Sequence, residues 1–506
     1  RGDESAHQLP PGSPGVLLTE SSTERERQPQ IQSGALAGRS LGSAILLLAL
    51  PVMVQQLLQA FVGMTDKLLA GHLAADVRVA ALDAIGIGSY VGWFIGIAMS
   101  GLGIGGQAII ARAMGAGDRA LARHALGQAM GISFGWGALV GVLLYTLAPA
   151  VAQLTRLTPA ATDFFVEYLR LLSISMPLAG IMFVGAMCLH GAGETRKPAL
   201  IAVVVNIVNA GLSWAFSGAD LELAAFPGYA GADVLENPFS FDLGVGGIAL
   251  GTAVGNVFGA ALTWWALLRG VPDLSLSRSE LRPRRAMIKR FLRVGVPNFA
   301  EGIAMWAVNL FVLLFIGRIA SESGLLDGGL QGAHIIAIQW ESFSFLPGYA
   351  IGTASATLAA QYLGAGSVAM AKRAILACAA FAMTLMGGLG LVFIFFGEEL
   401  TRLISSEPVH LETVPELLKI CGSVQVFFAL TMVMRQSLRG MGDTRWCFLI
   451  TTVSSYGVRL PATYVLGISM GRGLKGIGYG LCGEFIVRSC LFTGRFLHGG
   501  WRSVRV

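Results

Sequence analysis

One acidic residue lies inside the first long apolar segment of the chain, which begins near residue 41. If this segment crosses a membrane, a charge in it costs at least about 2.5–3.5 kcal/mol, so an acid there is expected to have a function. We expect Asp66 to bind a proton or a cation, and Pro51, about four turns earlier, to kink the helix. The alternative is an acid at the membrane edge that the adjacent Lys67 compensates.

A pair of amides, Asn206 and Asn209, lies three residues apart in the fifth apolar segment. Residues at this spacing share one face of a helix. The two side chains can supply neutral oxygen ligands for a cation, or hydrogen bonds to Asp66. Paired amides also join helices to one another by hydrogen bonds, and the sequence leaves both interpretations open.

Two further acids lie in apolar segments of the second half of the chain. Glu301 follows Pro297 by four residues, and Glu341 lies in the middle of the next segment. These acids can form a second cation site or contact a cationic substrate, with Pro297 as a second kink. Alternatively, each carboxylate pairs with a buried arginine, such as Arg435 or Arg459. The sequence favours neither interpretation.

Aromatic and amide side chains occur near these acids. They are Trp306, Gln339, Trp340, Phe343 and Phe345. Because aromatic faces attract organic cations, these residues are candidates for the lining of a substrate cavity. Aromatic residues at this spacing are more often ordinary core residues, so that alternative also stays open.

Membrane-spanning helices must position these side chains. Hydrophobic residues make up 54% of the 506 residues and charged residues only 13%, which is about half the charged share of a soluble protein. A helix needs about 20 residues to cross the hydrocarbon core of a bilayer. Apolar runs of this length begin near residues 41, 81, 125, 167, 198, 244, 294, 333, 374, 414, 446 and 474. The sequence therefore predicts an all-α integral membrane protein with twelve transmembrane helices.

The two halves of the chain repeat each other at an interval of 249 residues. The segment 189–196 (LHGAGETR) recurs as 438–445 (LRGMGDTR), and 112–117 (RAMGAG) recurs as 361–366 (QYLGAG). Six spans in each half give both halves the same orientation, as parallel repeats related by a pseudo-twofold axis along the membrane normal. Two copies of one membrane bundle usually indicate a transporter, with its substrate path between the copies.

We attribute the net charge of +6 to membrane topology and not to nucleic-acid binding, because of how the charged residues are distributed. Basic residues concentrate in alternate connections, whereas the segment 217–243 carries acids and no Lys or Arg. Because cytoplasmic loops retain Lys and Arg, we expect both termini in the cytoplasm and the protein in the plasma membrane. The expected regions are a disordered tail (1–35), a first lobe (36–270), a basic cytoplasmic linker (271–293), a second lobe (294–498) and a C-terminal tail (499–506).

Motifs of soluble enzymes occur only in or beside apolar runs. The segment 101–106 matches GxGxxG, and the segments 131–135 and 467–471 match GxSxG. No strand precedes them, so we interpret their small residues as helix-packing positions. The six cysteines form no CxxC pair, and the chain has neither an HExxH motif nor a His/Asp cluster for a metal. We therefore expect a protein that is not an enzyme and has no cofactor or metal.

Taken in order from about residue 36 onward, the motifs of this chain resemble those of the multidrug and toxic compound extrusion (MATE) family. The strings that carry the resemblance are 50–51 (LP), 62–66 (VGMTD), 111–118 (ARAMGAGD), 190–196 (HGAGETR), 206–209 (NIVN), 295–297 (GVP) with Glu301, 340–348 (WESFSFLPG), 439–444 (RGMGDT) and 457–461 (GVRLP).

The resemblance implies an antiporter that exports amphipathic, often cationic organic compounds against an influx of protons or sodium, by alternating access between its lobes. In the family, an aspartate at the position of Asp66 is central to ion coupling, and an amide like Asn209 joins its network. An acid like Glu301 couples ions in another branch. The implied partners are small organic substrates and membrane lipid, and we expect a monomer.

The chain departs from the family pattern in three places. Lys67 replaces the usual small or polar neighbour of the aspartate, and Ser213 stands where many relatives carry a second acid. Apolar Phe427 and Phe428 lie in the tenth span, where some members use an acid. Since a sodium site needs several oxygen ligands, these changes favour protons as the coupling ion.

Three other functions are alternatives. The first is a flippase for lipid-linked precursors, which would be expected to have a larger, more cationic cavity and often extra spans. A membrane-embedded enzyme would need a catalytic constellation that the sequence does not offer. A channel fits less well, because two non-identical lobes that both carry acids suit alternating access better than a static pore.

Overall fold

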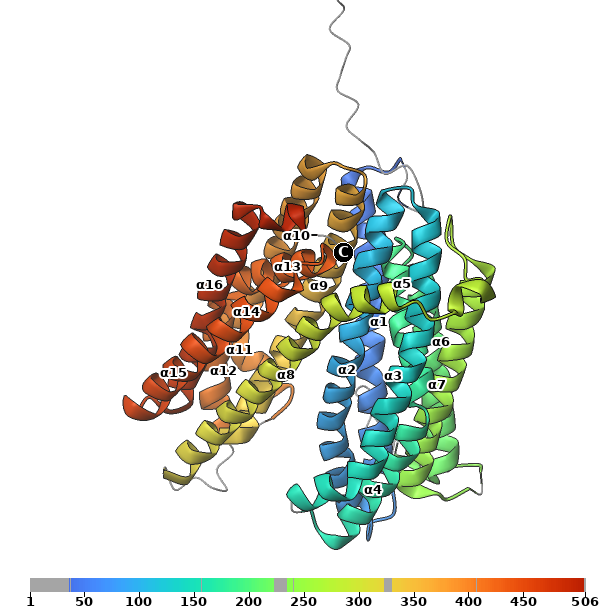
Figure 1. The fold of residues 1–506 in the computed structure, drawn as a ribbon. Helices are drawn as coiled ribbons and strands as arrows, with labels where there is room; N and C mark the ends of the chain where they lie inside the picture. The colour runs from blue at the N-terminus through green and yellow to red at the C-terminus, as the bar shows by residue number, and fades with distance from the viewer. Residues whose placement is uncertain are drawn as a thin grey trace, which may run out of the picture.

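The computed structural model describes residues 36, 38–155, 157–222, 234–239, 241–322, 330–405 and 407–504. The tail expected at 1–35 lies outside these residues. The described chain is helical almost throughout, and its helices form two bundles that stand side by side (Figure 1).

The first bundle is built mainly from the first half of the chain. Its helices are α1 (Leu41–Gly71), α2 (Arg78–Gly115), α3 (Arg119–Leu154), α4 (Pro159–Ile174), α5 (Met176–Gly191), α6 (Arg196–Ser217) and α7 (Gly244–Arg269). Between α6 and α7, the short strands β1 (Leu221–Glu222) and β2 (Val234–Leu235) pair antiparallel. This pairing lies within the acid-rich segment 217–243.

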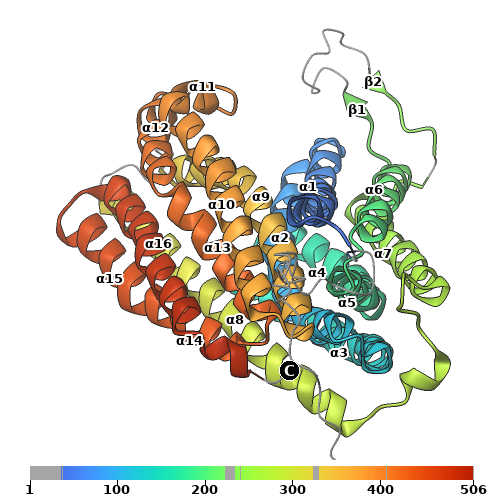
Figure 2. The same ribbon diagram turned by 90° about the horizontal axis from the view of Figure 1, so that it is seen from above.

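The second bundle follows a connection that crosses α3 and contains the 3₁₀-helix η2 (Arg278–Leu281) (Figure 2). Its helices are α8 (Arg285–Glu322), α9 (Leu330–Gly364), α10 (Val368–Phe395), α11 (Gly397–Arg402), α12 (Pro408–Ser423), α13 (Gln425–Gly440), α14 (Thr444–Ser454), α15 (Leu460–Thr463) and α16 (Gly473–His498). Two π-helical segments, η3 (Ser455–Arg459) and η4 (Tyr464–Ser469), flank α15, and the 3₁₀-helix η5 (Gly500–Ser503) ends the described chain.

The helices group into two repeated sets of six membrane-crossing segments, as the sequence predicts. Seven described helices cross singly, and the pairs α4–α5 and α12–α13 each form one broken span, bent by 58° and 54°. The breaks fall at Ser175 and Val424, which are 249 residues apart, the same interval as the sequence repeat. In chain order, α9, the segment from α14 to η4, and α16 hold the places in the second set that α2, α6 and α7 hold in the first.

The later part of the predicted linker at 271–293 is helical in the structure. Helix α8 begins at Arg285, nine residues before the predicted start of the seventh span, so the later part of the linker is helical. The reason is that its basic residues interrupt the apolar run without interrupting the helix, since Arg and Lys are good helix formers. Helix α4 likewise begins early, at Pro159, because the Thr158 hydroxyl caps it by accepting from the Ala161 N–H.

The repeated glycine-rich strings form the same turn in both halves. Gly117 and Gly366 have φ values of 72° and 81°, and Gly193 and Gly442 have 84° and 91°. In each turn, the N–H that follows the glycine donates to the carbonyl oxygen five residues earlier. This is a left-handed helix cap that favours glycine. The repeat in the sequence is therefore a repeat in the backbone.

The GxGxxG-like segment is a packing surface, as expected. On α2, a Cβ atom added to Gly101 would lie 3.1 Å from the Gly295 carbonyl oxygen of α8. A Cβ atom added to Gly106 would lie 2.8 Å from the Cys188 sulfur of α5. Small residues here let α2 approach both neighbours closely.

The first helix of each half also packs against the opposite half. Ile45 and Leu48 of α1 belong to a buried cluster that is otherwise formed mainly by second-half residues such as Leu358. Reciprocally, Phe291 of α8 belongs to a cluster of first-half residues such as Leu126. The two bundles are thus interlocked through α1 and α8.

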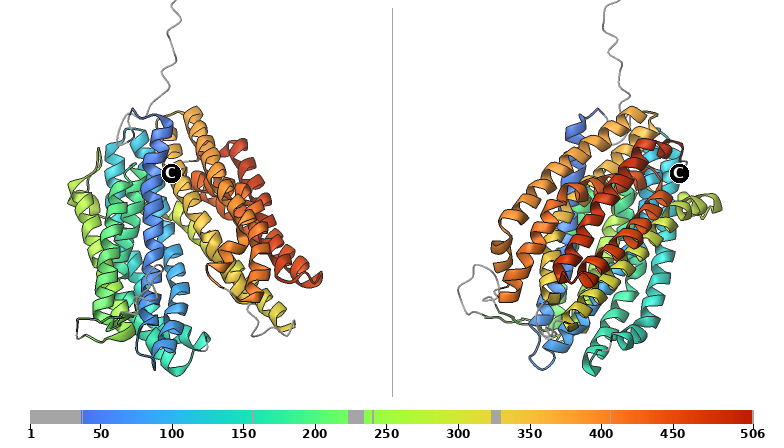
Figure 3. Two further views of the ribbon diagram at one scale, coloured as in Figure 1. Left: turned by 180° about the vertical axis from the view of Figure 1, so that it is seen from behind. Right: turned by 90° about the vertical axis from the view of Figure 1, so that its left-hand side faces the viewer.

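The bundles meet at the end of the molecule that holds the start of α1 and the end of α16, and they diverge toward the opposite end (Figures 1 and 3). At the joined end, Gln107 of α2 donates to the Thr357 hydroxyl of α9 at 3.1 Å, and Gln361 donates to the Gly191 carbonyl oxygen at 2.9 Å. The basic connections all lie toward this same end, since successive spans alternate in direction.

Candidate functional site

Asp66 is buried in the first bundle and accepts hydrogen bonds from two hydroxyls. The residue is 3% exposed. The Tyr168 hydroxyl of α4 donates to its Oδ2 at 2.8 Å, and the Thr252 hydroxyl of α7 donates to its Oδ1 at 3.4 Å. Helices α1, α4 and α7 therefore converge on one carboxylate.

The hydrogen-bond chain continues from Thr252 to α6. Asn209 Nδ2 donates to the Thr252 Oγ1 at 2.7 Å and to the Ser213 Oγ at 3.4 Å. Ser213 in turn donates to the Ile248 carbonyl oxygen at 3.1 Å. The donors run in one direction from Asn209 through Thr252 to Asp66, which suits a carboxylate that only accepts.

The structure brings together some of the residues that the sequence predicts around Asp66. Asn209 joins the network through Thr252, but Asn206 donates to the Ala202 carbonyl oxygen of its own helix at 2.9 Å. Lys67 is exposed, because successive helix residues point about 100° apart. Within the described chain, no basic side chain lies within ion-pair distance of the Asp66 carboxylate.

Two glycines hold the neighbouring helices close to this site. A Cβ atom added to Gly88 of α2 would lie 3.1 Å from the Tyr168 ring. A Cβ atom added to Gly251 of α7 would overlap the Ser213 hydroxyl. Tyr168 and Ser213 therefore have little freedom to move away from their hydrogen-bond partners.

Pro51 lies inside the continuous helix α1. A proline inside a helix leaves the carbonyl four residues earlier without its helical donor. Here the Thr195 hydroxyl donates to that carbonyl oxygen, at Leu47, at 3.0 Å. Thr195 thus stabilises the proline site from the α5–α6 turn. Pro297 likewise lies inside the continuous helix α8.

Glu301 is fully buried in the second bundle and is surrounded by fixed donors. Arg439 holds its Oε2 through Nη2 at 2.8 Å and Nε at 3.2 Å. The Thr451 hydroxyl donates to Oε1 at 2.7 Å, and the Arg435 guanidinium lies 3.8 Å from Oε1. This geometry favours the interpretation of Glu301 as the partner of buried arginines.

A second buried ion cluster lies outside the sequence predictions. Glu484 of α16 is 0% exposed and contacts Arg459 at 3.1 Å and Arg488 at 2.5 Å. Arg488 also donates to the hydroxyls of Ser454 and Ser455. Arg459 and Ser455 belong to the π-helical segment η3, and such segments often occur at functional positions in helices.

The described contacts do not link Glu341 to the aromatic candidates by a hydrogen bond or an ion pair. Glu341 is partly exposed and forms no hydrogen bond or ion pair within the described part of the chain, while Arg459 is bound to Glu484. Trp340 and Phe343 contact each other with ring centroids 5.6 Å apart.

The remaining aromatic candidates lie elsewhere. Phe345 packs instead with Tyr349 and Phe428. Trp306 is 37% exposed and Gln339 is exposed. An aromatic cavity lined by Trp306, Gln339, Trp340 and Phe343 therefore stays a prediction.

Two of the buried acids, Asp66 and Glu301, differ in the charge of the groups that contact them. Asp66 accepts hydrogen bonds from two hydroxyl groups and, in the described part of the chain, has no basic side chain within ion-pair distance. Glu301 instead has the guanidinium groups of Arg439 and Arg435 within ion-pair distance. Among the described residues, no three His, Cys, Asp or Glu side chains come together as they would around a metal.

Comparison with known proteins places the chain in a family. The model of the MatE family matches residues 51–215 and 297–465, one segment in each half and more than half of the chain in total. The chain is 28% identical over 468 residues to "Probable multidrug resistance protein NorM" of Thermotoga maritima, covering 90% of this chain and 92% of that protein. It is 25% identical over 462 residues to "Multidrug resistance protein PmpM" of Pseudomonas aeruginosa, covering 88% and 89%.

Solved structures share the fold at lower identity. The Vibrio cholerae MATE transporter VcmN in the bent form superposes with a TM-score of 0.78 at 17% identity, covering 90% of this chain and 96% of that one. An outward-facing multidrug resistance MATE family transporter of the MOP superfamily superposes with a TM-score of 0.76 at 20% identity, covering 92% and 98%. The chain belongs to the MATE family and is a multi-pass membrane protein of two repeated six-helix halves.

Proposed function

We propose that this protein is a secondary active antiporter that exports amphipathic, often cationic organic compounds in exchange for protons. The multidrug resistance names of its relatives NorM and PmpM support export of varied organic compounds. The observation that carries the choice of protons is the environment of Asp66, a buried carboxylate whose partners are hydroxyl groups. Those partners can either donate or accept, so they tolerate both the charged and the protonated acid.

Proton binding at Asp66 would reorganise contacts between helices. The carboxylate accepts from Tyr168 and Thr252, but a protonated carboxyl group must donate one hydrogen bond. One hydroxyl would then rotate and accept, which changes the link from α1 to α4 or to α7. Because Pro51 removes one hydrogen bond of the α1 ladder, α1 is the helix best able to change its bend in response.

Alternating access follows if the proton and the substrate prefer different arrangements of the bundles. The described structure is joined at the end that holds the start of α1 and the end of α16, and the Lys and Arg bias favours a cytoplasmic location for that end. In this state, Asp66 would take up a proton from outside while substrate leaves. Each ligand shifts the equilibrium only by its difference in affinity for the two states. Solved relatives in bent, straight and outward-facing forms support a fold that changes conformation.

Glu301 fits a structural role better than a second coupling site. Its contacts with Arg439 and Arg435 already neutralise it, so a sodium ion would have to displace a guanidinium group. We therefore propose coupling in the first bundle alone, at the plasma membrane, with both termini in the cytoplasm.

A flippase for lipid-linked precursors is the second candidate. Four buried or largely buried arginines in the second bundle favour it, since a polyanionic lipid headgroup needs cationic partners. They are Arg435, Arg439, Arg459 and Arg488. Two of their charges are neutralised by Glu301 and Glu484, which is the reason that we rank this function second.

Efflux from intact cells separates these functions. Cells that express the protein are loaded with a fluorescent organic cation, and efflux is followed with and without a protonophore and in sodium-free medium. Antiport with protons predicts efflux that the protonophore abolishes and that sodium removal leaves unchanged. Asp66→Asn should abolish efflux, whereas the exposed Asp163→Asn serves as a matched control. Loss of efflux on sodium removal alone would contradict proton coupling, and no efflux under any condition would favour the flippase.

A further inference from the structure

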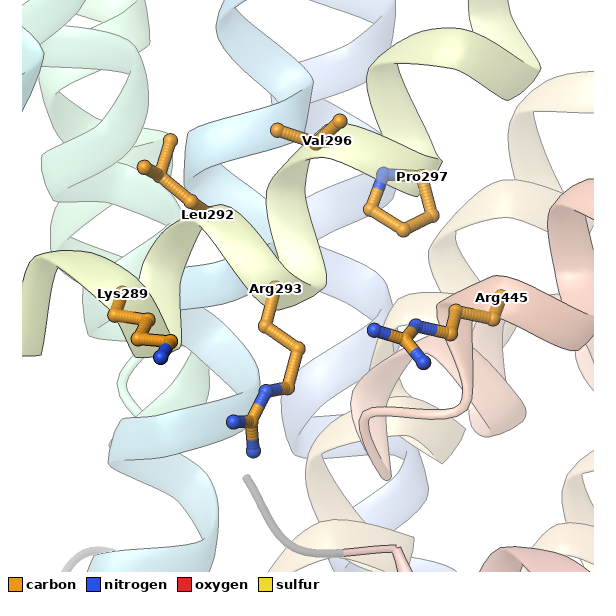
Figure 4. A pocket seen from close by; sticks show the side chains of 6 residues that line it. All are labelled: Lys289, Leu292, Arg293, Val296, Pro297 and Arg445. Carbon is orange, nitrogen blue, oxygen red and sulfur yellow. The ribbon is translucent and has the colours of Figure 1, made fainter.

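A pocket of about 410 Å³ lies between the start of α8 and the start of α14, at the end where the bundles meet. The residues that line it are Lys289, Leu292, Arg293, Val296, Pro297 and Arg445 (Figure 4). Its size falls in the usual range of ligand sites. No acidic residue lines it, so it is separate from the sites of Asp66 and Glu301.

Three of the lining residues are cations, and the other three are apolar. Lys289 and Arg293 lie four residues apart on α8 and share one face of the helix. Arg445 extends from α14 toward α8 (Figure 4). Within the described chain, none of the three lies within ion-pair distance of a carboxylate, although the nearby Arg439 and Arg495 do. Three cationic side chains therefore lie around a mostly apolar pocket, without an ion-pair partner in the described part of the chain.

The apolar part of the pocket is exposed. Leu292 is 47% exposed and Val296 is 54% exposed. Exposed apolar side chains near the end of a membrane-spanning helix suit contact with lipid acyl chains. Cationic groups beside such a surface suit a ligand that has an anionic head and an apolar tail.

We propose that this pocket binds one anionic phospholipid. Its phosphate would lie between Arg293 and Arg445, with Lys289 at the edge, and its acyl chains would follow Leu292 and Val296. A soluble phosphate compound would satisfy the cations but leave the apolar surface uncovered, so a lipid is the better match. The proposal does not depend on which substrate the protein transports.

A lipid in this pocket would hold α8 to α14. The same two helices are joined further along by the hydrogen bond from Thr451 to Glu301, at 2.7 Å. The bound headgroup would therefore add a second link between the two helices that are joined at Glu301. Removing the lipid should loosen this pair of helices and lower the thermal stability of the protein.

Lipid binding to the purified full chain in neutral detergent tests the proposal. Phosphatidylglycerol and phosphatidylcholine with identical acyl chains are added, and bound lipid is counted by native mass spectrometry alongside the melting temperature. The test variant is Lys289→Gln/Arg293→Gln/Arg445→Gln. The matched control is Arg282→Gln/Arg285→Gln/Arg290→Gln, which removes three exposed cations of the same region that do not line the pocket.

We expect one tightly bound phosphatidylglycerol, and a higher melting temperature with it, in the wild type and the control variant. The test variant should bind phosphatidylglycerol about tenfold more weakly. Phosphatidylcholine should bind equally weakly to all three proteins. Equal phosphatidylglycerol binding by test and control variants would overturn the proposal. So would an equal stabilisation by inorganic phosphate alone, which would identify a site for a soluble oxyanion. If the triple variant does not fold, the double variant Arg293→Gln/Arg445→Gln replaces it, and its phosphatidylglycerol binding and melting temperature are compared with those of the control in the same way.

Discussion

Gly115 and Gly364, which are 249 residues apart, each lie against the backbone of the other's helix where the two bundles meet. A Cβ atom added to Gly115 would overlap the Gln361 carbonyl oxygen, and one added to Gly364 would overlap the Arg112 carbonyl oxygen. The contact is thus the same on both sides, as a pseudo-twofold axis requires. Only glycine at both positions permits this approach of the two halves.

Gly115→Ala should therefore destabilise the joined end. The new methyl group meets backbone atoms that cannot rotate away, and such overpacking costs about 1–3 kcal/mol. Thermal unfolding in detergent measures the effect. Gly92→Ala on the same helix is the control, because its Cβ atom would meet nothing within 4 Å. Equal melting temperatures for the two variants would show that α2 and α9 do not approach as closely as described.

Tyr168→Phe should destabilise the first bundle more when Asp66 is present than when it is replaced by Asn. The substitution removes one of two hydroxyl donors to a buried carboxylate, which costs about 1–3 kcal/mol. In Asp66→Asn, the same change should cost less, because the charge that the hydroxyl stabilises is gone. A double-mutant cycle of melting temperatures measures this coupling. Additive effects would mean that the hydrogen bond contributes nothing specific.

Thr195→Val should alter α1 at a distance from the acid. The substitution keeps the shape of the side chain but leaves the Leu47 carbonyl oxygen without its donor. A buried unsatisfied carbonyl costs about 1–3 kcal/mol, so we expect a lower melting temperature. Adding Pro51→Ala restores a helical N–H to that carbonyl and should remove most of the cost of Thr195→Val. A Thr195→Val effect of equal size with and without Pro51→Ala would argue against this link.

Substitutions at Glu301 distinguish its two interpretations. Glu301→Gln leaves Arg439 buried without its counter-ion, and breaking a buried pair costs about 3–5 kcal/mol. If Glu301 is structural, the variant is less stable but its efflux still depends on the proton gradient. The exposed pair Arg402 and Glu398 provides a control, since Glu398→Gln should change stability little. A stable Glu301→Gln variant that has lost its dependence on the gradient would instead assign coupling to Glu301.

The sequence predicts the repeat and the spans well because both depend on local properties. Apolar runs mark the helices, and the glycines of the segments 112–117 and 361–366 mark turns that need positive φ. The start of α8 at Arg285 could not be predicted in this way, because hydropathy detects the apolar part of a helix and not its charged first turns.

The network around Asp66 could be predicted only in part. Asn209 could be predicted, because a polar residue inside an apolar run marks a candidate site residue. Tyr168 and Thr252 lie 102 and 186 residues from Asp66, and only the packing of α1, α4 and α7 brings them together. Glu484 and Arg488 give a usable signal, since they are charges four residues apart inside the last apolar segment.

Proton uptake by purified protein tests the central claim, that Asp66 carries the coupling proton. Wild type, Asp66→Asn and Asp163→Asn are reconstituted into liposomes that contain a pH-sensitive dye, and an organic cation gradient is imposed without a pH gradient. We expect substrate-driven proton movement in wild type and Asp163→Asn, and none in Asp66→Asn, although all three show the same melting behaviour. Undiminished substrate-driven proton movement in a folded Asp66→Asn protein would contradict the account.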